Sequence, residues 1–179
     1  IYDGLSHYSI ASFNKDIYNL AVTINGLSKS HSMTGWRVGY LAAPMDIAQA
    51  VSKIQDHSTS NTSSISQKAA LAALNAPGEF SNNLCQEFQK RRDYIVSRLN
   101  DIKKIKYVMP KGAFYIFCNI SETGLDSDLF AERLLNEMHV CLIPGSGFGM
   151  TDYVRISFAN NTEQLAKGLD RLDDWLKKL

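Results

Sequence analysis

Two cationic side chains share one polar, glycine-containing segment, residues 25–40. Lys29 and Arg37 are eight positions apart in it. A lysine held near cationic groups and partly desolvated has a lowered pKa and forms a Schiff base with a carbonyl. An arginine guanidinium clamps phosphate oxygens in a bidentate manner, and Ser28 with nearby backbone N–H groups would add neutral donors. Together these groups suit a phosphorylated aldehyde.

Each of these residues also has a simpler interpretation. A lone lysine in a loop is most often a solvated charge, and a lone arginine at the start of a strand is usually a surface or ion-pair residue. Two nucleotide-binding alternatives are excluded, because the sequence has neither G-x-x-x-x-G-K-[ST] nor G-x-G-x-x-G opening a helix. The glycine-rich run 145–149 does not have the second pattern and precedes a predicted strand.

Short strands must position this segment. Strands are expected over 20–24 and 36–43, on either side of a polar loop, and helices over 48–54 and 65–74. Strands with Val and Ile at successive positions are usually buried on both faces. Two strands and two helices cannot provide that cover, so this half of the sequence is predicted to be incomplete by itself.

The second half indicates a compact α+β unit. Apolar side chains recur at mostly four- and seven-residue steps from residue 83 to about residue 103, which predicts one long helix. Asn161 and Gln164 have the spacing of a capping box at the start of a final helix. The remaining expected elements are strands over 105–109, 113–120, 140–143 and 153–159, and a helix over 129–137.

Composition excludes several classes of protein. With 45% hydrophobic and 21% charged residues and a net charge of +1, the sequence is typical of a soluble globular protein with no nucleic-acid or membrane partner. Its three cysteines, Cys85, Cys118 and Cys141, contain no C-x-x-C pair, so no metal site is expected and a reducing cytoplasm is the default location. The chain begins at Ile1 without an initiator Met, which suggests a start within a longer sequence.

The run S-K-S-H-S-M-T-G-W-R-V-G at residues 28–39 resembles the lysine motif of class I/II aminotransferases, the aspartate-aminotransferase-like family of fold type I. The resemblance implies pyridoxal 5'-phosphate as cofactor. It implies that Lys29 forms the Schiff base with this cofactor and carries the proton between the substrate Cα and the cofactor. It also implies that Arg37 binds the cofactor phosphate, with Ser28 beside it. Gly26 stands where some members have a phosphate-binding serine, so phosphate binding is expected to depend more on Arg37.

Three further segments resemble the same family. Ile1-Tyr2 resembles the end of a D-E-x-Y strand, which implies that the Tyr2 hydroxyl binds the phenolate oxygen of the cofactor, and the aspartate that pairs with the pyridine nitrogen is expected before Ile1. P-K-G-A-F-Y at 110–115 resembles the strand entry of the small domain. Y-V-R-I-S-F-A at 153–159 resembles the strand whose arginine, here Arg155, binds the substrate α-carboxylate. Strand alternation agrees, because Arg155 points away from the face of its apolar neighbours.

The resemblance implies an α/β fold: the C-terminal part of a fold-type I transferase, with the end of the large cofactor domain over 1–80 and the small α+β domain over 81–179. The implied reaction moves an amino group between an amino acid and a 2-oxo acid, in a homodimer when the protein is full length. By itself, the 179-residue chain is expected to bind the cofactor weakly and to be inactive.

Some alternatives stay open from the sequence. A C–S β-lyase of the same fold would keep Lys29, Arg37 and Arg155, and a cofactor-sensing domain of a transcription regulator would need a DNA-binding module before Ile1. Ser60 and Asn61 match a segment that lies near the cofactor phosphate of the neighbouring subunit in the family, but a helix N-cap explains them equally well.

Overall fold

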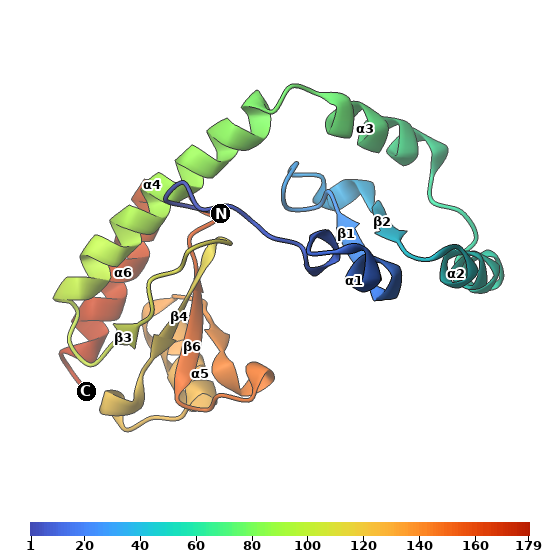
Figure 1. Ribbon diagram of the computed structural model, residues 1–179. Helices are drawn as coiled ribbons and strands as arrows, with labels where there is room; N and C mark the ends of the chain where they lie inside the picture. The colour runs from blue at the N-terminus through green and yellow to red at the C-terminus, as the bar shows by residue number, and fades with distance from the viewer. The chain divides into compact units, whose positions relative to one another are not determined.

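The computed structural model describes residues 1–179, which form two compact units. Unit 1 combines Ile1–Leu5 with Leu84–Leu179, and unit 2 is Ser6–Asn83 (Figure 1). The chain passes from unit 2 back into unit 1 within helix α4, Glu79–Asp101. None of the helices combines the length and the apolar composition that a bilayer span requires.

Unit 2 is built around a small antiparallel sheet. Strands β1 and β2 pair from Thr23↔Ala42 to Gly26↔Gly39. The elements of unit 2, in chain order, are the 3₁₀ helix η1 (Ile10–Ser12), α1 (Lys15–Leu20), β1 (Thr23–Gly26), the 3₁₀ helix η2 (Thr34–Trp36), β2 (Gly39–Ala42), α2 (Met45–Ser58) and α3 (Ser64–Asn75).

The two helices expected over 48–54 and 65–74 are confirmed as α2 and α3, and both are longer than expected. The first expected strand is wrong in position. Leu20 ends helix α1, whose first turn is capped by the Asn14 side chain accepting from the Ile17 N–H, and β1 begins only at Thr23. The second expected strand is shorter than expected, because Thr34–Trp36 turns as a 3₁₀ helix before β2.

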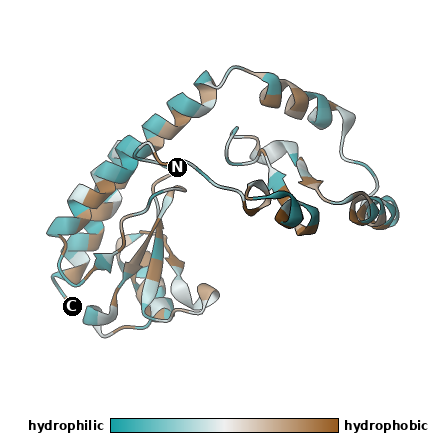
Figure 2. Ribbon diagram, in the orientation of Figure 1, coloured by the Kyte–Doolittle hydropathy of each residue, from teal (hydrophilic) through white to brown (hydrophobic).

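Apolar side chains of unit 2 remain largely uncovered. Ile24 on β1 is 80% exposed, and hydrophobic residues are visible along α1, α2 and α3 (Figure 2). Only two hydrophobic side chains of this unit, Leu27 and Met33, are buried. The incomplete cover predicted for this half is therefore observed.

Unit 1 contains a four-stranded antiparallel sheet in the order β3-β4-β6-β5. Its strands are β3 (Lys106–Tyr107), β4 (Tyr115–Asn119), β5 (Ile143–Pro144) and β6 (Tyr153–Ser157). Its other elements are the main part of α4, α5 (Ser127–Met138), α6 (Thr162–Leu176) and the 3₁₀ helices η3 (Ser121–Thr123) and η4 (Gly145–Phe148).

The core of unit 1 lies between one face of this sheet and the helices. Ile116 and Cys118 on β4 alternate with outward-facing neighbours, and Val154 on β6 is also fully buried. They pack in one cluster with Leu99 of α4 and Trp175 of α6. Burial raises the pKa of the Cys118 thiol to about 12, so this cysteine is an unreactive core residue.

Most expected elements of unit 1 are confirmed, including the long helix α4 and the final helix α6. Asn161 caps α6, because its side chain accepts from the Gln164 N–H at 2.9 Å. The strand expected over 140–143 is wrong in position, since β5 consists of Ile143 and Pro144 alone. Helix α5 begins earlier than expected, where the Asp126 side chain accepts from two backbone N–H groups of the first turn.

Candidate functional site

Three of the predicted site residues, Ser28, Lys29 and Arg37, lie in the loop that joins β1 to β2. The pair Gly26↔Gly39 closes the neck of this hairpin. A Cβ on Gly39 would lie 3.1 Å from the Asn25 carbonyl oxygen, so the close approach of the two strands favours glycine there. The loop of residues 27–38 therefore carries an amine, a guanidinium and a hydroxyl between fixed ends.

Two buried side chains hold the first part of this loop. Leu27 is 2% and Met33 is 6% exposed. The Leu27 carbonyl accepts from the N–H groups of His31 and Met33, at 3.2 and 3.3 Å. These contacts fold residues 28–32 into a compact turn in which Lys29 is exposed. Lys29 therefore lies on a turn that the buried side chains of Leu27 and Met33 hold in place.

Arg37 has an unusual backbone conformation. Its φ is +51° and its ψ is +52°, the left-handed region that residues other than glycine rarely adopt. Its Nη1 donates to the Thr34 carbonyl oxygen at 3.0 Å, which bends the side chain back over the loop. Strained residues of this kind concentrate at ligand-binding sites, so the conformation favours a functional role for Arg37.

Ser60 and Asn61 lie between α2 and α3. Ser60 adopts φ +57° and donates its backbone N–H to Gln55, which closes the C-terminal end of α2. The N-cap position of α3 belongs to Ser63. The helix N-cap explanation for Ser60 and Asn61 is therefore wrong, and their role at a phosphate stays a prediction.

Arg155 lies in unit 1, on the inner strand β6. Its neighbours across the sheet are Phe117 on β4 and Ile143 on β5. Strand alternation places Arg155 on the face opposite the core residues Val154 and Ile156, as expected. Its Nε is buried and has no hydrogen-bond partner, and no salt bridge in the structure includes it. A buried guanidinium N–H without a partner can donate a hydrogen bond to an anion from outside the chain.

Two aromatic side chains that the sequence reasoning missed flank this arginine. The guanidinium carbon of Arg155 lies 4.2 Å from the ring centroid of Tyr115 and 5.1 Å from that of Phe148. Tyr115 belongs to the P-K-G-A-F-Y run and Phe148 to the glycine-rich run 145–149. Both runs are recognisable in the sequence, but their spacing does not predict that they meet at one arginine.

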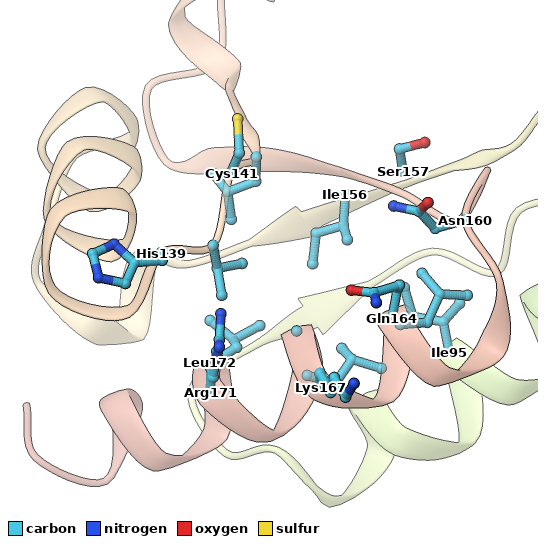
Figure 3. A pocket seen from close by; sticks show the side chains of 15 residues that line it. Ile95, His139, Cys141, Ile156, Ser157, Asn160, Gln164, Lys167, Arg171 and Leu172 are labelled. Carbon is cyan, nitrogen blue, oxygen red and sulfur yellow. The ribbon is translucent and has the colours of Figure 1, made fainter.

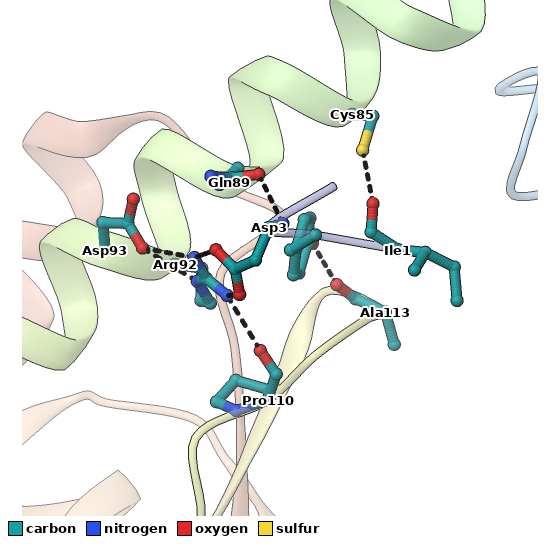
Figure 4. Close-up of polar contacts among 9 residues, drawn as sticks. Ile1, Asp3, Cys85, Gln89, Arg92, Asp93, Pro110 and Ala113 are labelled. Carbon is teal, nitrogen blue, oxygen red and sulfur yellow. Dashed lines mark hydrogen bonds and ion pairs between the residues drawn. The ribbon is translucent and has the colours of Figure 1, made fainter. Parts of the chain in front are cut away.

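Tyr2 lies in unit 1, on the N-terminal segment that packs against α4 (Figure 4). Its side chain is buried, its ring lies beneath the Arg92 guanidinium at 4.9 Å, and its hydroxyl donates to the Ala113 carbonyl. Burial raises the pKa of Tyr2 to about 12, with a smaller contribution from Cys85. Its role at the cofactor stays a prediction, and that role would require the hydroxyl to leave Ala113.

The ion pair next to Tyr2 explains why this segment is fixed. Arg92 donates to both carboxylate oxygens of Asp3 at 2.6 Å and also to Asp93 and to the Pro110 carbonyl. The Cys85 thiol donates to the Ile1 carbonyl at 2.9 Å. In Figure 4, α4 contacts residues 1–3 through Cys85 and Arg92, and Arg92 also binds the Pro110 carbonyl in the loop before β4.

A pocket of about 280 Å³ in unit 1 contains none of the predicted site residues (Figure 3). It is lined by apolar residues such as Ile95 of α4 and Leu172 of α6, and by polar side chains of α6 such as Gln164 and Lys167. Ile156, which also lines it, alternates with Arg155 along β6. The pocket is therefore separate from the arginine that the sequence singled out.

Comparisons with known proteins agree with these features. A family model described as aminotransferase class I and II matches residues 1–172. The aspartate aminotransferase of Bacillus sp. strain YM-2 is 41% identical over 99% of this chain and 46% of its own length. The crystal structure of the aspartate aminotransferase from Rhizobium meliloti matches 100% of this chain and 47% of its own, at 36% identity and a TM-score of 0.94.

The aromatic aminotransferase structure from Pyrococcus horikoshii OT3 matches 99% of this chain and 48% of its own, at 40% identity and a TM-score of 0.94. The chain spans about half the length of the curated relatives it matches. These matches confirm the resemblance and the partial fold-type I α/β class expected from the sequence. The chain therefore belongs to the class I and II aminotransferase family.

Proposed function

We propose that the intact protein is a pyridoxal-phosphate-dependent aminotransferase that moves an amino group between an amino acid and a 2-oxo acid. The observation that carries this proposal is the β1–β2 loop, which presents Lys29 and Arg37 from one fixed hairpin. Relatives named aspartate aminotransferase and aromatic-amino-acid aminotransferase support the reaction class. Their names do not agree on one substrate, so the proposal stops at the class.

The donor set of the loop fits a phosphorylated aldehyde. Lys29 supplies the primary amine that reacts with an aldehyde, and its exposed position leaves it accessible. The Arg37 guanidinium has five N–H donors, of which Nη1 donates to the Thr34 carbonyl oxygen. The other donors can bind phosphate oxygens. The Ser28 hydroxyl precedes the lysine directly and adds a neutral donor.

Each residue has a separate task in the proposed reaction. Pyridoxal phosphate, when bound, supplies the electron sink for the negative charge that develops at the substrate Cα. Lys29 Nζ takes the proton from the substrate Cα and delivers it to the cofactor, on the other side of the transferred nitrogen. Arg37 holds the phosphate, which keeps the reacting carbon at a fixed distance from Nζ.

Arg155 is proposed to bind the substrate α-carboxylate. An unsatisfied buried donor costs about 1–3 kcal/mol, and a carboxylate oxygen at Nε would remove that cost. The planar guanidinium matches a carboxylate in a way that a lysine ammonium does not. Tyr2 is proposed to bind the phenolate oxygen of the cofactor.

The organisation of the intact protein belongs to the same proposal. Residues 1–80 would be the end of the large cofactor domain, and residues 81–179 the small domain. The uncovered apolar side chains of unit 2 support the presence of further protein that covers them, either a second subunit of a homodimer or the rest of the large domain. Three free cysteines support a reducing, cytoplasmic location.

The test uses the intact protein with a panel of amino acids, with and without a 2-oxo acid acceptor. We expect product formation that depends on the acceptor, and we expect Lys29→Ala to lower the rate by on the order of 10²–10⁴-fold, because the proton carrier is lost. Lys53→Ala, on the exposed surface of α2, is the matched control and should retain the wild-type rate. Pyruvate release without an acceptor, or full activity of Lys29→Ala, would contradict the proposal.

A further inference from the structure

The side chains around Arg155 form a continuous aromatic group on the outer face of the sheet of unit 1. Phe117 and Arg155 are directly opposite in the β4–β6 ladder, and Tyr115 lies diagonally next to Arg155. The Phe117 ring stacks on the Tyr153 ring with their centroids 4.9 Å apart. It forms a T-shaped pair with the Phe148 ring, with centroids 6.0 Å apart. Arg155 is thus the one charged member of an aromatic cluster that comes from β4, β6 and η4.

We propose that Phe148 and Tyr115 form an aromatic clamp that fixes the guanidinium plane of Arg155 and so positions it for the substrate carboxylate. The proposal rests on the proposed function, because it takes Arg155 as the carboxylate-binding residue. Arginine is attracted to the face of an aromatic ring within about 6 Å of its centroid. Both rings meet that condition, at 4.2 Å and 5.1 Å.

The backbone of the glycine-rich run 145–149, which carries Phe148, is held close to β6 and to α5. A Cβ on Gly145 would lie 2.3 Å from the Met150 carbonyl oxygen and 2.4 Å from that of Tyr153, so only glycine allows the loop to pass so close to β6. The Ser146 N–H donates to Ser127 Oγ at 3.1 Å. Gly145 is therefore required by this close approach to β6, three residues before Phe148.

Ser146 ties the same loop to the start of α5 a second time. Its hydroxyl contacts the Asp128 carboxylate at 2.9 Å, while the Ser127 N–H donates to the Thr151 carbonyl at 2.7 Å. The loop is thus held on both sides of Phe148. A fixed aromatic ring restricts the arginine rotamers, and an arginine that is already oriented loses less conformational entropy when it binds a carboxylate.

The chemistry of the substrate predicts which kinetic constant the clamp changes. The α-carboxylate keeps its charge from amino acid to 2-oxo acid, so its contact with Arg155 is equally strong in the ground state and in the transition state. Loss of such a uniform contact raises KM and leaves kcat nearly unchanged. Phe148 and Tyr115 are therefore positioning residues, and they act through Arg155.

The experiment replaces Phe148 by leucine in the intact protein, which keeps an apolar side chain and removes the aromatic face. Phe148 is 52% exposed, so the substitution leaves the core intact. We expect KM for the amino acid and for the 2-oxo acid to rise by about 3- to 10-fold, with kcat changed less than about twofold. Phe148→Tyr should restore the wild-type KM, because it keeps the ring, and Met150→Leu is the matched loop control.

A double-mutant cycle separates the clamp from a general effect on the loop. In an Arg155→Met background, Phe148→Leu should change KM no further. Titration of 2-oxoglutarate into the intact protein measures carboxylate binding independently of turnover, and Phe148→Leu should weaken it by the same factor.

The two proposals fail in different ways. A wild-type protein that binds 2-oxoglutarate without transferring an amino group contradicts the proposed function alone. Unchanged KM and unchanged 2-oxoglutarate binding in Phe148→Leu overturn the clamp, and so does a Phe148→Tyr variant that behaves like the leucine variant.

Discussion

Unit 1 and unit 2 differ in how much of their apolar surface they bury. Unit 1 has a continuous core that runs from α4 through the sheet to α5 and α6. Unit 2 has Leu27 and Met33 as its only buried hydrophobic side chains, and large apolar residues such as Ile24 and Leu20 are exposed. The unit that is least able to stabilise itself carries Lys29 and Arg37.

This difference has a physical explanation. A hydrophobic core is the main source of folding free energy, and unit 1 buries enough side chains to form one. The few anchors of unit 2 fix the β1–β2 loop locally, while the wider apolar surface of β1, α1 and α3 requires cover from other protein. The conformation of the loop around Lys29 is therefore fixed by Leu27 and Met33, whereas the stability of unit 2 depends on cover from other protein.

The largest expected effect on stability is in the core of unit 1. Leu99→Ala, at a side chain that is 1% exposed, should lower the free energy of unfolding by about 2–5 kcal/mol, because it leaves a cavity between α4 and the sheet. Urea denaturation of the intact protein measures this change. Leu135→Ala, on the exposed side of α5, is the control and should cost far less. If Leu99→Ala and Leu135→Ala lowered the free energy of unfolding equally, the placement of Leu99 in the core would be contradicted.

Ile24→Ala tests whether the apolar surface of unit 2 is covered in the intact protein. With cover, the substitution should lower the free energy of unfolding by about 1–3 kcal/mol, although Ile24 is 80% exposed in the chain alone. Denaturation of the intact protein again provides the measurement. A change within about 0.5 kcal/mol, as for ordinary surface positions, would show that β1 remains uncovered.

The smallest expected effect concerns the ion pair that holds the N-terminal segment on unit 1. Hydrogen bonds from Arg92 hold the pKa of Asp3 below its usual value, so the pair stabilises the fold above the pKa that Asp3 has when unfolded. This contribution is lost as the pH falls through the lower pKa of the folded state. Asp3→Asn should therefore lower the melting temperature at pH 7. The difference from wild type should begin to shrink as the pH falls below about 4 and should vanish only below the lowered pKa of folded Asp3.

The effect of Asp3→Asn stays small because Arg92 keeps Asp93 and the Pro110 carbonyl as partners. Asp56→Asn, at an exposed position on α2, should leave the melting temperature and its pH dependence as in wild type. A difference between wild type and Asp3→Asn that persists at low pH would indicate a cause other than this ion pair.

Elements with a clear hydrophobic period could be predicted from the sequence. Helices α4 and α6 follow from apolar repeats, and the start of α6 follows from Asn161, because these signals act within a few residues. The start of β1 was misplaced because Leu20 is as compatible with a strand as with the last turn of α1, and the Asn14 cap decides between them.

Contacts between distant segments were beyond the reach of the sequence. The left-handed conformation of Arg37 has no signature in its own residue type, and the two rings at Arg155 come from β4 and η4. Likewise, the burial of Tyr2 depends on Arg92 and Ala113, which lie far along the chain. The motifs identified the chemically relevant residues, and the packing around them came from the structure.

The assignment of Lys29 is tested most directly by the visible absorbance of the purified intact protein after addition of pyridoxal phosphate. A covalent link between the lysine amine and the cofactor gives a band that the free cofactor lacks. We predict that wild type and Lys53→Ala show this band and that Lys29→Ala does not. A Lys29→Ala protein that keeps the band would contradict the central claim, because another amine would then hold the cofactor.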